Sequence, residues 1–182
     1  MLSADKMNRA ITRIAHEILE HNGGAESVGL IGVITRGAFL AKRIASVIKQ
    51  VEKVEIPVGL MDISLYRDDV HSTLDQPIIQ RTELHFEVNH LNLVIIDDVL
   101  FTGRTVRAAL NHINDFGRPR TIQLAVLVDR GHRELPIKPD YVGLNLPTAK
   151  DDQVLVQVKE KDGADGVFIE RAGHGDDTGG EE

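Results

Sequence analysis

Three near-continuous apolar runs, at residues 28–34, 91–96 and 122–128, constrain the fold of this chain more than any other feature. Each run is rich in β-branched residues and is too short for a buried helix, so each indicates a strand. The first two runs are followed by apolar residues at helical spacing, which predicts a helix after each of them. Strands that are apolar on both faces and alternate with helices indicate a parallel sheet covered by helices on both sides. The sequence therefore predicts an α/β fold.

The length of 182 residues, 42% of them hydrophobic, suits one compact domain. We expect residues 1–170 to form it, beginning with an amphipathic helix that ends at Gly23. The charged, irregular segment 66–91 is too long for an ordinary connection, and it predicts a flexible loop or a projecting hairpin. Residues 129–170 are expected to form a small hood with late strands. The glycine-rich acidic tail, residues 171–182, is expected to be disordered.

The composition excludes several classes of protein. Lysine and arginine number 21 against 28 acidic residues, and the net charge of −7 argues against binding to nucleic acid through overall charge. The absence of cysteine excludes disulfides, thiolate metal sites and thiol nucleophiles. The first 22 residues carry too many charges for a signal peptide, and no apolar stretch reaches the length of a membrane span. We expect a cytoplasmic protein with no membrane partner.

The most informative motif is an acidic pair, Asp97-Asp98, at the carboxyl end of the second predicted strand. Ligands of open α/β sheets bind at this end of the strands. The following residues 102–105, Thr-Gly-Arg-Thr, enter a helix whose free N–H groups and positive end suit a phosphate. The two acids can accept hydrogen bonds from sugar hydroxyls and hold hydrated magnesium. The pattern predicts a ribose 5-phosphate ligand. The alternative, a strand end followed by a helix cap, does not explain the doubled acid.

This run resembles the phosphoribosyl pyrophosphate (PRPP) signature of the type I phosphoribosyltransferases. The resemblance implies that Asp97 and Asp98 hold the ribose hydroxyls, and that Mg²⁺ enters with PRPP and binds near them through water. The loop that would wrap the 5-phosphate and bind the nucleotide consists of Val99, Leu100, Phe101, Thr102, Gly103, Arg104 and Thr105.

Two other segments match the same family. The turn Thr35-Arg36-Gly37 follows the first predicted strand, in the place of the family's pyrophosphate loop. The resemblance implies that Arg36 and the backbone amides of this turn neutralise the leaving group. Arg67 lies in the segment that matches the family's mobile loop, and closure would bring it near the pyrophosphate. An ordinary solvated cation beside Asp68 is an equally good interpretation of Arg67.

Two positions bear on the base. Purine-using members of the family typically carry an acid where this chain has Phe101, and a lysine where it has Asp129. Asp129 is therefore the candidate base-binding residue, and both differences argue against hypoxanthine or guanine as the substrate. Residues 139–143 nevertheless resemble the hood of the purine enzymes.

At a finer level, residues 62–69 and above all 129–136, DRGHRELP, resemble the PyrR family of pyrimidine operon attenuation proteins. This resemblance implies uracil phosphoribosyltransferase activity, in which uracil and PRPP give UMP and pyrophosphate. It also implies binding to a stem-loop in the leader of pyrimidine (pyr) mRNA, strengthened by UMP or UTP. The implied RNA face, expected to lie remote from the PRPP loop, consists of Thr12, Arg13, His16, His132, Arg133 and Lys138.

Charge alone leaves alternatives open for this face. The same cations can be solvated partners of nearby glutamates, or part of a dimer contact. A purine or unassigned phosphoribosyltransferase with no RNA role is the second interpretation of the whole chain. We expect a homodimer or a higher homo-oligomer. We expect no DNA partner, because the chain has no room for a separate helix-turn-helix domain.

Overall fold

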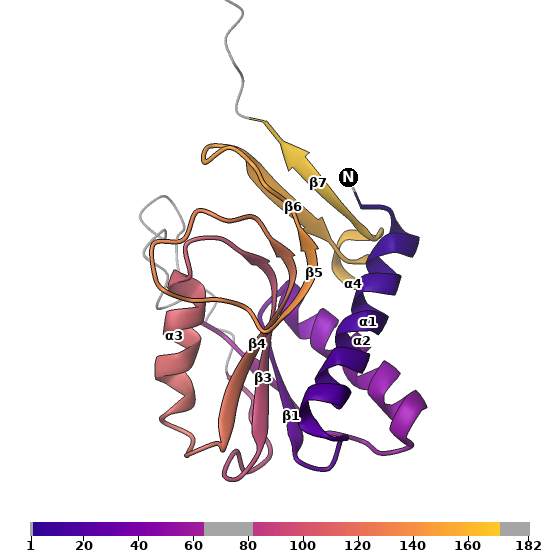
Figure 1. The fold of residues 1–182 in the computed structure, drawn as a ribbon, viewed down its shortest axis with the longest axis vertical. Coiled ribbons are helices and arrows are strands. Elements are labelled where there is room, and N and C mark those ends of the chain that lie inside the picture. The colour runs from indigo at the N-terminus through magenta and orange to yellow at the C-terminus, as the bar shows by residue number, and fades with distance from the viewer. Residues whose placement is uncertain (1, 64–81, 172–182) are drawn as a thin grey trace, which may run out of the picture.

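The computed structural model describes residues 2–63 and 82–171 of the chain. Four helices and seven labelled strands follow one another within these residues (Figure 1). In chain order they are α1 (Ala4–Asn22), β1 (Val28–Val33), α2 (Arg36–Glu52), β2 (Val58–Met61), β3 (Asn92–Leu100), α3 (Arg104–Ile113), β4 (Thr121–Asp129), β5 (Tyr141–Asn145), β6 (Gln153–Gln157), α4 (Lys159–Asp162) and β7 (Gly166–Glu170).

The main sheet has five strands in the order β2-β1-β3-β4-β5, and every neighbouring pair is parallel. The predicted α/β fold with a parallel sheet is confirmed. All six residues of β1 are buried, as expected for a strand that is covered on both faces. The register pairs Ile31 of β1 with Ile95 of β3, and Ile95 with Leu124 of β4.

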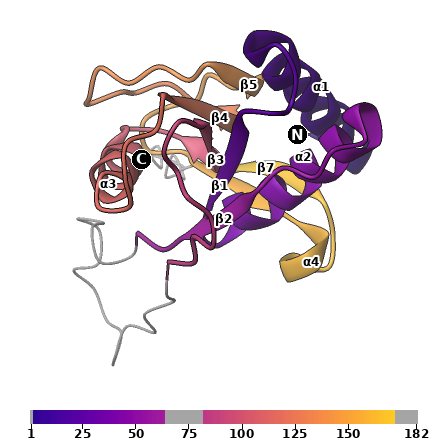
Figure 2. The ribbon, with the colours of Figure 1, turned by 90° about the horizontal axis from the view of Figure 1, so that it is seen from below.

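Helices cover both faces of this sheet (Figure 2). Helices α1 and α2 pack against one face, where Ile14, Ile44 and Val94 belong to one buried cluster. Helix α3 packs against the other face, where Ile113 joins Ile95 in a second cluster. Full burial of such a side chain contributes about 1.5–3 kcal/mol. The two clusters hold the strands so that their carboxyl ends meet at one edge.

The predicted late strands are present as β6 and β7, which form a separate antiparallel pair. Leu2 bridges to Val167 of β7, so the beginning of the chain lies against this small sheet. Among residues 2–63 and 82–171, no helix combines the length and the apolar character that a membrane span requires.

Three features of the strands differ from the prediction: one boundary, the place of one strand, and one additional strand. Strand β3 continues past Ile96 to Leu100, so the acidic pair lies inside the strand, near its carboxyl end, and not after it. Strand β5 was expected in the hood of residues 129–170, but it pairs with β4 and forms the edge of the main sheet. Strand β2 was not predicted, because it has only four residues with alternating burial. Of the predicted loop 66–91, residues 82–91 are described; residues 64–81 and the predicted tail from residue 172 onward lie outside the described residues.

Candidate active site

The acidic pair is held in place by the backbone that follows it. Asp97 is buried, and its Oδ1 accepts a hydrogen bond of 2.9 Å from the N–H of Asp98. Asp98 is half-buried, and its Oδ1 accepts a bond of 3.0 Å from the N–H of Val99. Within the described part of the chain, the second oxygen of Asp98 has no protein partner. This fixed carboxylate can accept hydrogen bonds from a ligand.

The loop after the acidic pair turns sharply into α3. Gly103 has a φ of 92°, which favours glycine, and α3 begins at the next residue. The hydroxyl of Thr102 accepts a bond of 3.3 Å from the N–H of Arg104. The first turn of a helix offers N–H groups without partners inside the helix. The loop therefore places an anion-binding helix end beside the acidic pair.

The turn of residues 35–37 packs directly on the acidic pair. A Cβ atom on Gly37 would lie 2.4 Å from the carbonyl oxygen of Ile96 and 3.2 Å from the Cα of Asp97. Gly32 allows an equally close approach, because its Cβ would lie 2.5 Å from the Cα of Ala38. The peptide bond between Ile34 and Thr35 is cis. The structure thus brings together two of the predicted site segments, the 35–37 turn and the 97–105 run.

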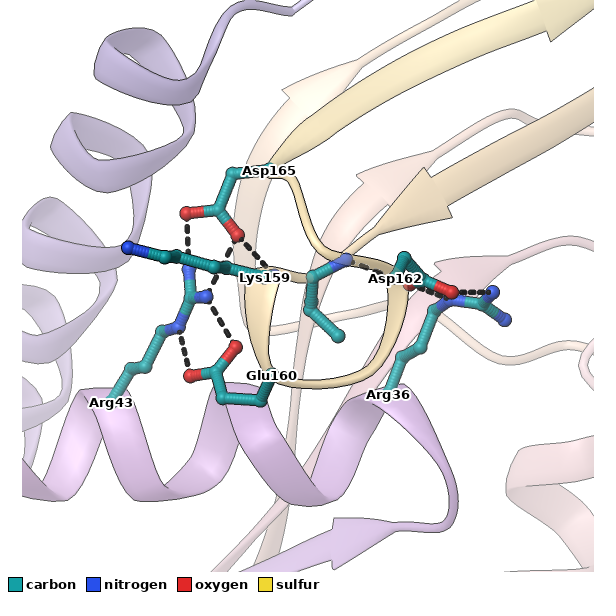
Figure 3. A network of polar contacts seen from close by, with 7 residues as sticks. Arg36, Arg43, Lys159, Glu160, Asp162 and Asp165 are labelled. Carbon is teal, nitrogen blue, oxygen red and sulfur yellow. Dashed lines mark hydrogen bonds and ion pairs between the residues drawn. The ribbon is translucent and has the colours of Figure 1, made fainter.

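Arg36 is held by an acid that the sequence did not single out. Its Nε and Nη2 donate to Oδ2 and Oδ1 of Asp162, at 3.1 and 2.9 Å (Figure 3). Arg36, together with the N–H of Val158, lowers the pKa of Asp162 from its usual value. Seven residues further along α2, Arg43 pairs with Glu160 and Asp165. The bonds that Arg43 donates to these acids, chiefly those to Glu160, raise the pKa of Arg43, against the effect of its burial.

The segment from residue 129 to 138 lies against the 100–104 loop. The N–H groups of Glu134 and Leu135 both donate to the carbonyl of Thr102, at 3.0 and 3.2 Å. Arg133 donates to the carbonyl of Phe101 at 3.0 Å, and Arg104 pairs with Glu134 at 2.8 Å. The expectation that Arg133 lies remote from the PRPP loop is therefore wrong. An irregular segment must find partners for its backbone groups, and it finds them in the loop.

Asp129, the candidate base-binding residue, is occupied within its own segment. Its Oδ2 accepts a bond of 2.6 Å from Nη2 of Arg133, and its Oδ1 accepts one of 3.0 Å from the N–H of Gly131. Arg133 also donates to the carbonyl of Ile137 at 3.0 Å. These contacts make Asp129 a residue that shapes the segment over the loop.

Phe101 is enclosed by the same segment. The guanidinium of Arg130 lies 4.1 Å from the centre of the Phe101 ring, and the ring of His132 approaches it edge-on at 6.1 Å. Arg130 is buried and donates to the hydroxyl of Thr148 and to two carbonyls that follow it. Arg130 is thus buried in the fold, although it lies among the charged residues of the 129–136 stretch.

The amino-terminal part of the predicted RNA face lies on α1. Thr12, Arg13 and His16 are exposed. Arg13 donates to the carbonyls of Val142 and Gly143 in β5, at 3.0 and 2.8 Å.

The two parts of the face lie on opposite sides of the main sheet, with β5 between them (Figure 2). In the first part, on α1, Arg13 also pairs with Glu17 at 2.7 Å. The second part, the 129–138 segment, packs on the side of α3, where Ile137 joins the apolar cluster. Lys138 and His132 are exposed there. The face is therefore two patches that flank an edge strand.

Arg67, which the sequence predicts to approach the pyrophosphate, lies outside the described residues.

The family model described as the phosphoribosyl transferase domain matches residues 1–162 of the chain. A curated relative named "Bifunctional protein PyrR", from Deinococcus radiodurans, is 58% identical over 169 residues, covering 93% of this chain and 92% of the relative. A protein of the same name from a Roseiflexus species is 53% identical over 172 residues, covering 94% of each chain.

Solved structures show the same fold at low sequence identity. A hypoxanthine phosphoribosyltransferase from Staphylococcus aureus aligns with a TM-score of 0.66 and 17% identity, over 89% of this chain and 85% of that one. One from Trypanosoma cruzi, in complex with the product IMP, aligns with a TM-score of 0.62 and 19% identity, over 82% and 76%. Together with the relatives, this fold confirms the predicted family: the chain is a member of the PyrR family and has the type I phosphoribosyltransferase fold.

Proposed function

We propose that this protein transfers a phosphoribosyl group from PRPP to uracil, and that it also binds a stem-loop of pyrimidine mRNA. The observation that carries the catalytic part is the packing of Gly37 on Ile96 and Asp97. At this contact the 35–37 turn lies beside the acidic pair, which supports the assignment of the turn to pyrophosphate and of the acids to the ribose; the start of α3, which follows the acids, suits the 5-phosphate. The "Bifunctional protein PyrR" relatives support the two-part function.

In the proposed reaction, N1 of uracil attacks C1 of the PRPP ribose, the bond from C1 to the pyrophosphate oxygen breaks so that pyrophosphate leaves with the electron pair, and the proton of N1 passes to solvent water. The protein acts by positioning and charge stabilisation and needs no nucleophilic side chain. Asp97 and Asp98 hold the ribose hydroxyls, the first turn of α3 holds the 5-phosphate, and Arg36 faces the pyrophosphate.

Magnesium fits this site as a partner of PRPP. The protein offers two adjacent carboxylates at the end of β3, and no cluster of three or more ligand side chains occurs within the described residues. Mg²⁺ commonly binds through one or two carboxylates, substrate phosphates and several waters. When bound, it would neutralise charge that develops on the leaving pyrophosphate.

Uracil is the proposed base, because Phe101 offers no group that can exchange a proton with a purine ring. Arg130 and His132 fix this ring in place. Asp129 contributes by shaping the segment over the site. A purine or unassigned phosphoribosyltransferase remains the alternative function, and a panel of uracil, hypoxanthine and guanine at one PRPP concentration separates the two. Turnover of a purine equal to that of uracil would favour the alternative.

The decisive variant for catalysis is Asp98→Asn. It keeps the size of the side chain but removes the charge that strengthens hydrogen bonds to the ribose, so kcat/KM should fall by roughly 10- to 100-fold. The unfolding midpoint should change little, since Asp98 is half-buried and one of its oxygens has no described protein partner. Wild-type turnover in the folded variant would remove Asp98 from the mechanism.

The proposed RNA face combines Thr12, Arg13 and His16 on one side of β5 with His132 and Lys138 on the other. Arg133 supports it indirectly, through the segment that it holds. Lys138 is exposed and has no hydrogen bond or ion pair with the described residues, so Lys138→Gln isolates RNA binding. Binding to the leader stem-loop should weaken, and the salt dependence of the affinity should become less steep by about one unit.

Lys42→Gln, on the exposed side of α2, is the matched control. Equal RNA affinity in both variants would contradict the proposed face. Because the proposed ligands are mRNA and nucleotides, we also propose a cytoplasmic location, together with a homodimer or higher homo-oligomer.

A further inference from the structure

Arg36 and Asp162 form a two-point ion pair between the start of α2 and the short α4. Nε of Arg36 donates to Oδ2 of Asp162 at 3.1 Å, and Nη2 donates to Oδ1 at 2.9 Å. The exposed fractions of the two side chains are 33% and 15%. Figure 3 shows the guanidinium and the carboxylate edge to edge, with Arg36 rising from the first turn of α2. A bidentate pair of this kind fixes the plane of the guanidinium as well as its position.

The carboxylate is itself fixed by its own turn. Oδ2 of Asp162 accepts a second bond, of 2.9 Å, from the N–H of Val158, which precedes α4. Asp162 is therefore a rigid partner for Arg36. Nη1 of Arg36 has no partner within the described residues, so the outer edge of the guanidinium keeps donors for a ligand.

We propose that Asp162 is a positioning residue that holds one edge of the Arg36 guanidinium and thereby presents the other edge to the pyrophosphate group of PRPP. The inference rests on the proposed function, which assigns the 35–37 turn to pyrophosphate. An arginine that is already immobilised loses less conformational entropy when it binds a ligand. Asp162 acts through Arg36 and touches no substrate.

A second ion-pair system joins the same elements and provides a control. Asp165 accepts two bonds from Arg43, at 3.0 and 2.7 Å, and one of 2.8 Å from the N–H of Lys159. Asp165 and Asp162 thus have the same kinds of partner, an arginine of α2 and a backbone N–H at the start of α4. Seven residues separate Arg43 from Arg36, which is about 10 Å along a helix. Asp165 therefore anchors the same region without contacting the 35–37 turn.

The experiment measures by titration calorimetry the Kd of the full-length protein for PRPP, inorganic pyrophosphate and UMP. Asp162→Asn keeps an oxygen for the N–H of Val158 but turns an amide N–H₂ toward Nη2 of Arg36. We expect the Kd for PRPP and for pyrophosphate to rise roughly two- to ten-fold. The Kd for UMP, which has no pyrophosphate, should not change. Asp165→Asn should leave all three values unchanged, and the unfolding midpoint of each variant reports whether it is folded.

The inference is overturned if Asp162→Asn binds PRPP as well as or better than the wild type, if UMP binding weakens equally, or if Asp165→Asn has the same effect. Arg36→Ala separates this failure from failure of the proposed function. If Arg36→Ala weakens pyrophosphate binding and Asp162→Asn does not, only the role of Asp162 is refuted. Unchanged pyrophosphate binding by Arg36→Ala refutes the assignment of the turn itself, and the role of Asp162 with it.

Discussion

Replacing Gly37 by alanine tests the contact on which the site is built. The added Cβ would lie 2.4 Å from the carbonyl oxygen of Ile96, whereas ordinary contact begins at 3.4 Å. Both this oxygen and the Cα of Asp97, 3.2 Å away, belong to the backbone of β3 and cannot rotate aside. The 35–37 turn and the acidic pair must therefore separate by about 1 Å, the difference between the two distances.

Two effects should follow, one on stability and one on rate. Overpacking of this kind costs about 1–3 kcal/mol of unfolding free energy, which leaves a domain of this size folded. A misplacement of about 1 Å between groups that act on one substrate costs on the order of 10²-fold in rate. The Gly37→Ala variant should thus remain folded, and its kcat/KM for PRPP should fall by about two orders of magnitude.

Circular dichroism melting and a uracil assay with varied PRPP measure these effects. Gly29→Ala is the control, because the three atoms nearest to its Cβ would belong to side chains, of Leu93, Leu91 and Phe86, at 3.1–3.4 Å. Residue 29 lies near the beginning of β1, away from the 35–37 turn, so this change should lower stability slightly and leave PRPP kinetics intact. If folded Gly37→Ala retained wild-type kcat/KM, the close packing of the turn on β3 would have no part in catalysis.

Two further outcomes are expected. Arg133→Gln should lower the unfolding free energy by about 2 kcal/mol and reduce turnover, because it removes bonds to Asp129 and to the Phe101 carbonyl. Denaturant unfolding and the uracil assay measure the two effects, and an unchanged unfolding midpoint would contradict the prediction. The pKa of Asp165 is lowered from 3.8, chiefly by Arg43, so the ion pair stabilises the protein above this pH and its contribution is lost as the pH falls through the lowered pKa. The stability difference between the wild type and Asp165→Asn should accordingly shrink in acid, as urea unfolding at pH 7 and in strong acid would measure; a constant difference would count against this linkage.

The predictable part of the fold is the part that local pattern determines. The strand of residues 28–33 and the helix after it follow from a buried apolar run and from apolar residues at helical spacing, and both are present. Strand β5 lacks such a signal, because only one of its five residues is buried. Its place is set by pairing with β4, which joins Ala125 to Tyr141. A short edge strand is stabilised by its neighbour, and a single sequence does not reveal that neighbour.

The site was predictable to the same degree. The 35–37 turn and the 97–105 run were found from their position after buried strands, and the structure brings them together. The acids around α4 were not found, because Asp162 lies 126 residues from Arg36 in the sequence. A charged stretch such as residues 159–165 indicates a polar surface but not which cation it meets. Partners at this separation are set by the tertiary fold alone.

The predicted cations of the RNA face show why the availability of a cation for a ligand cannot be read from charge. Arg13 donates to carbonyls of the edge strand β5, and Arg133 donates to carbonyls at residues 101, 131 and 137. An edge strand and an irregular segment both leave carbonyls without partners, and the five donors of a guanidinium satisfy several at once. Lysine is a point charge without this geometry, and Lys138 stays exposed. Arginines beside irregular backbone are therefore the weaker candidates for ligand contacts, and the lysine and histidines of the two patches are the stronger ones.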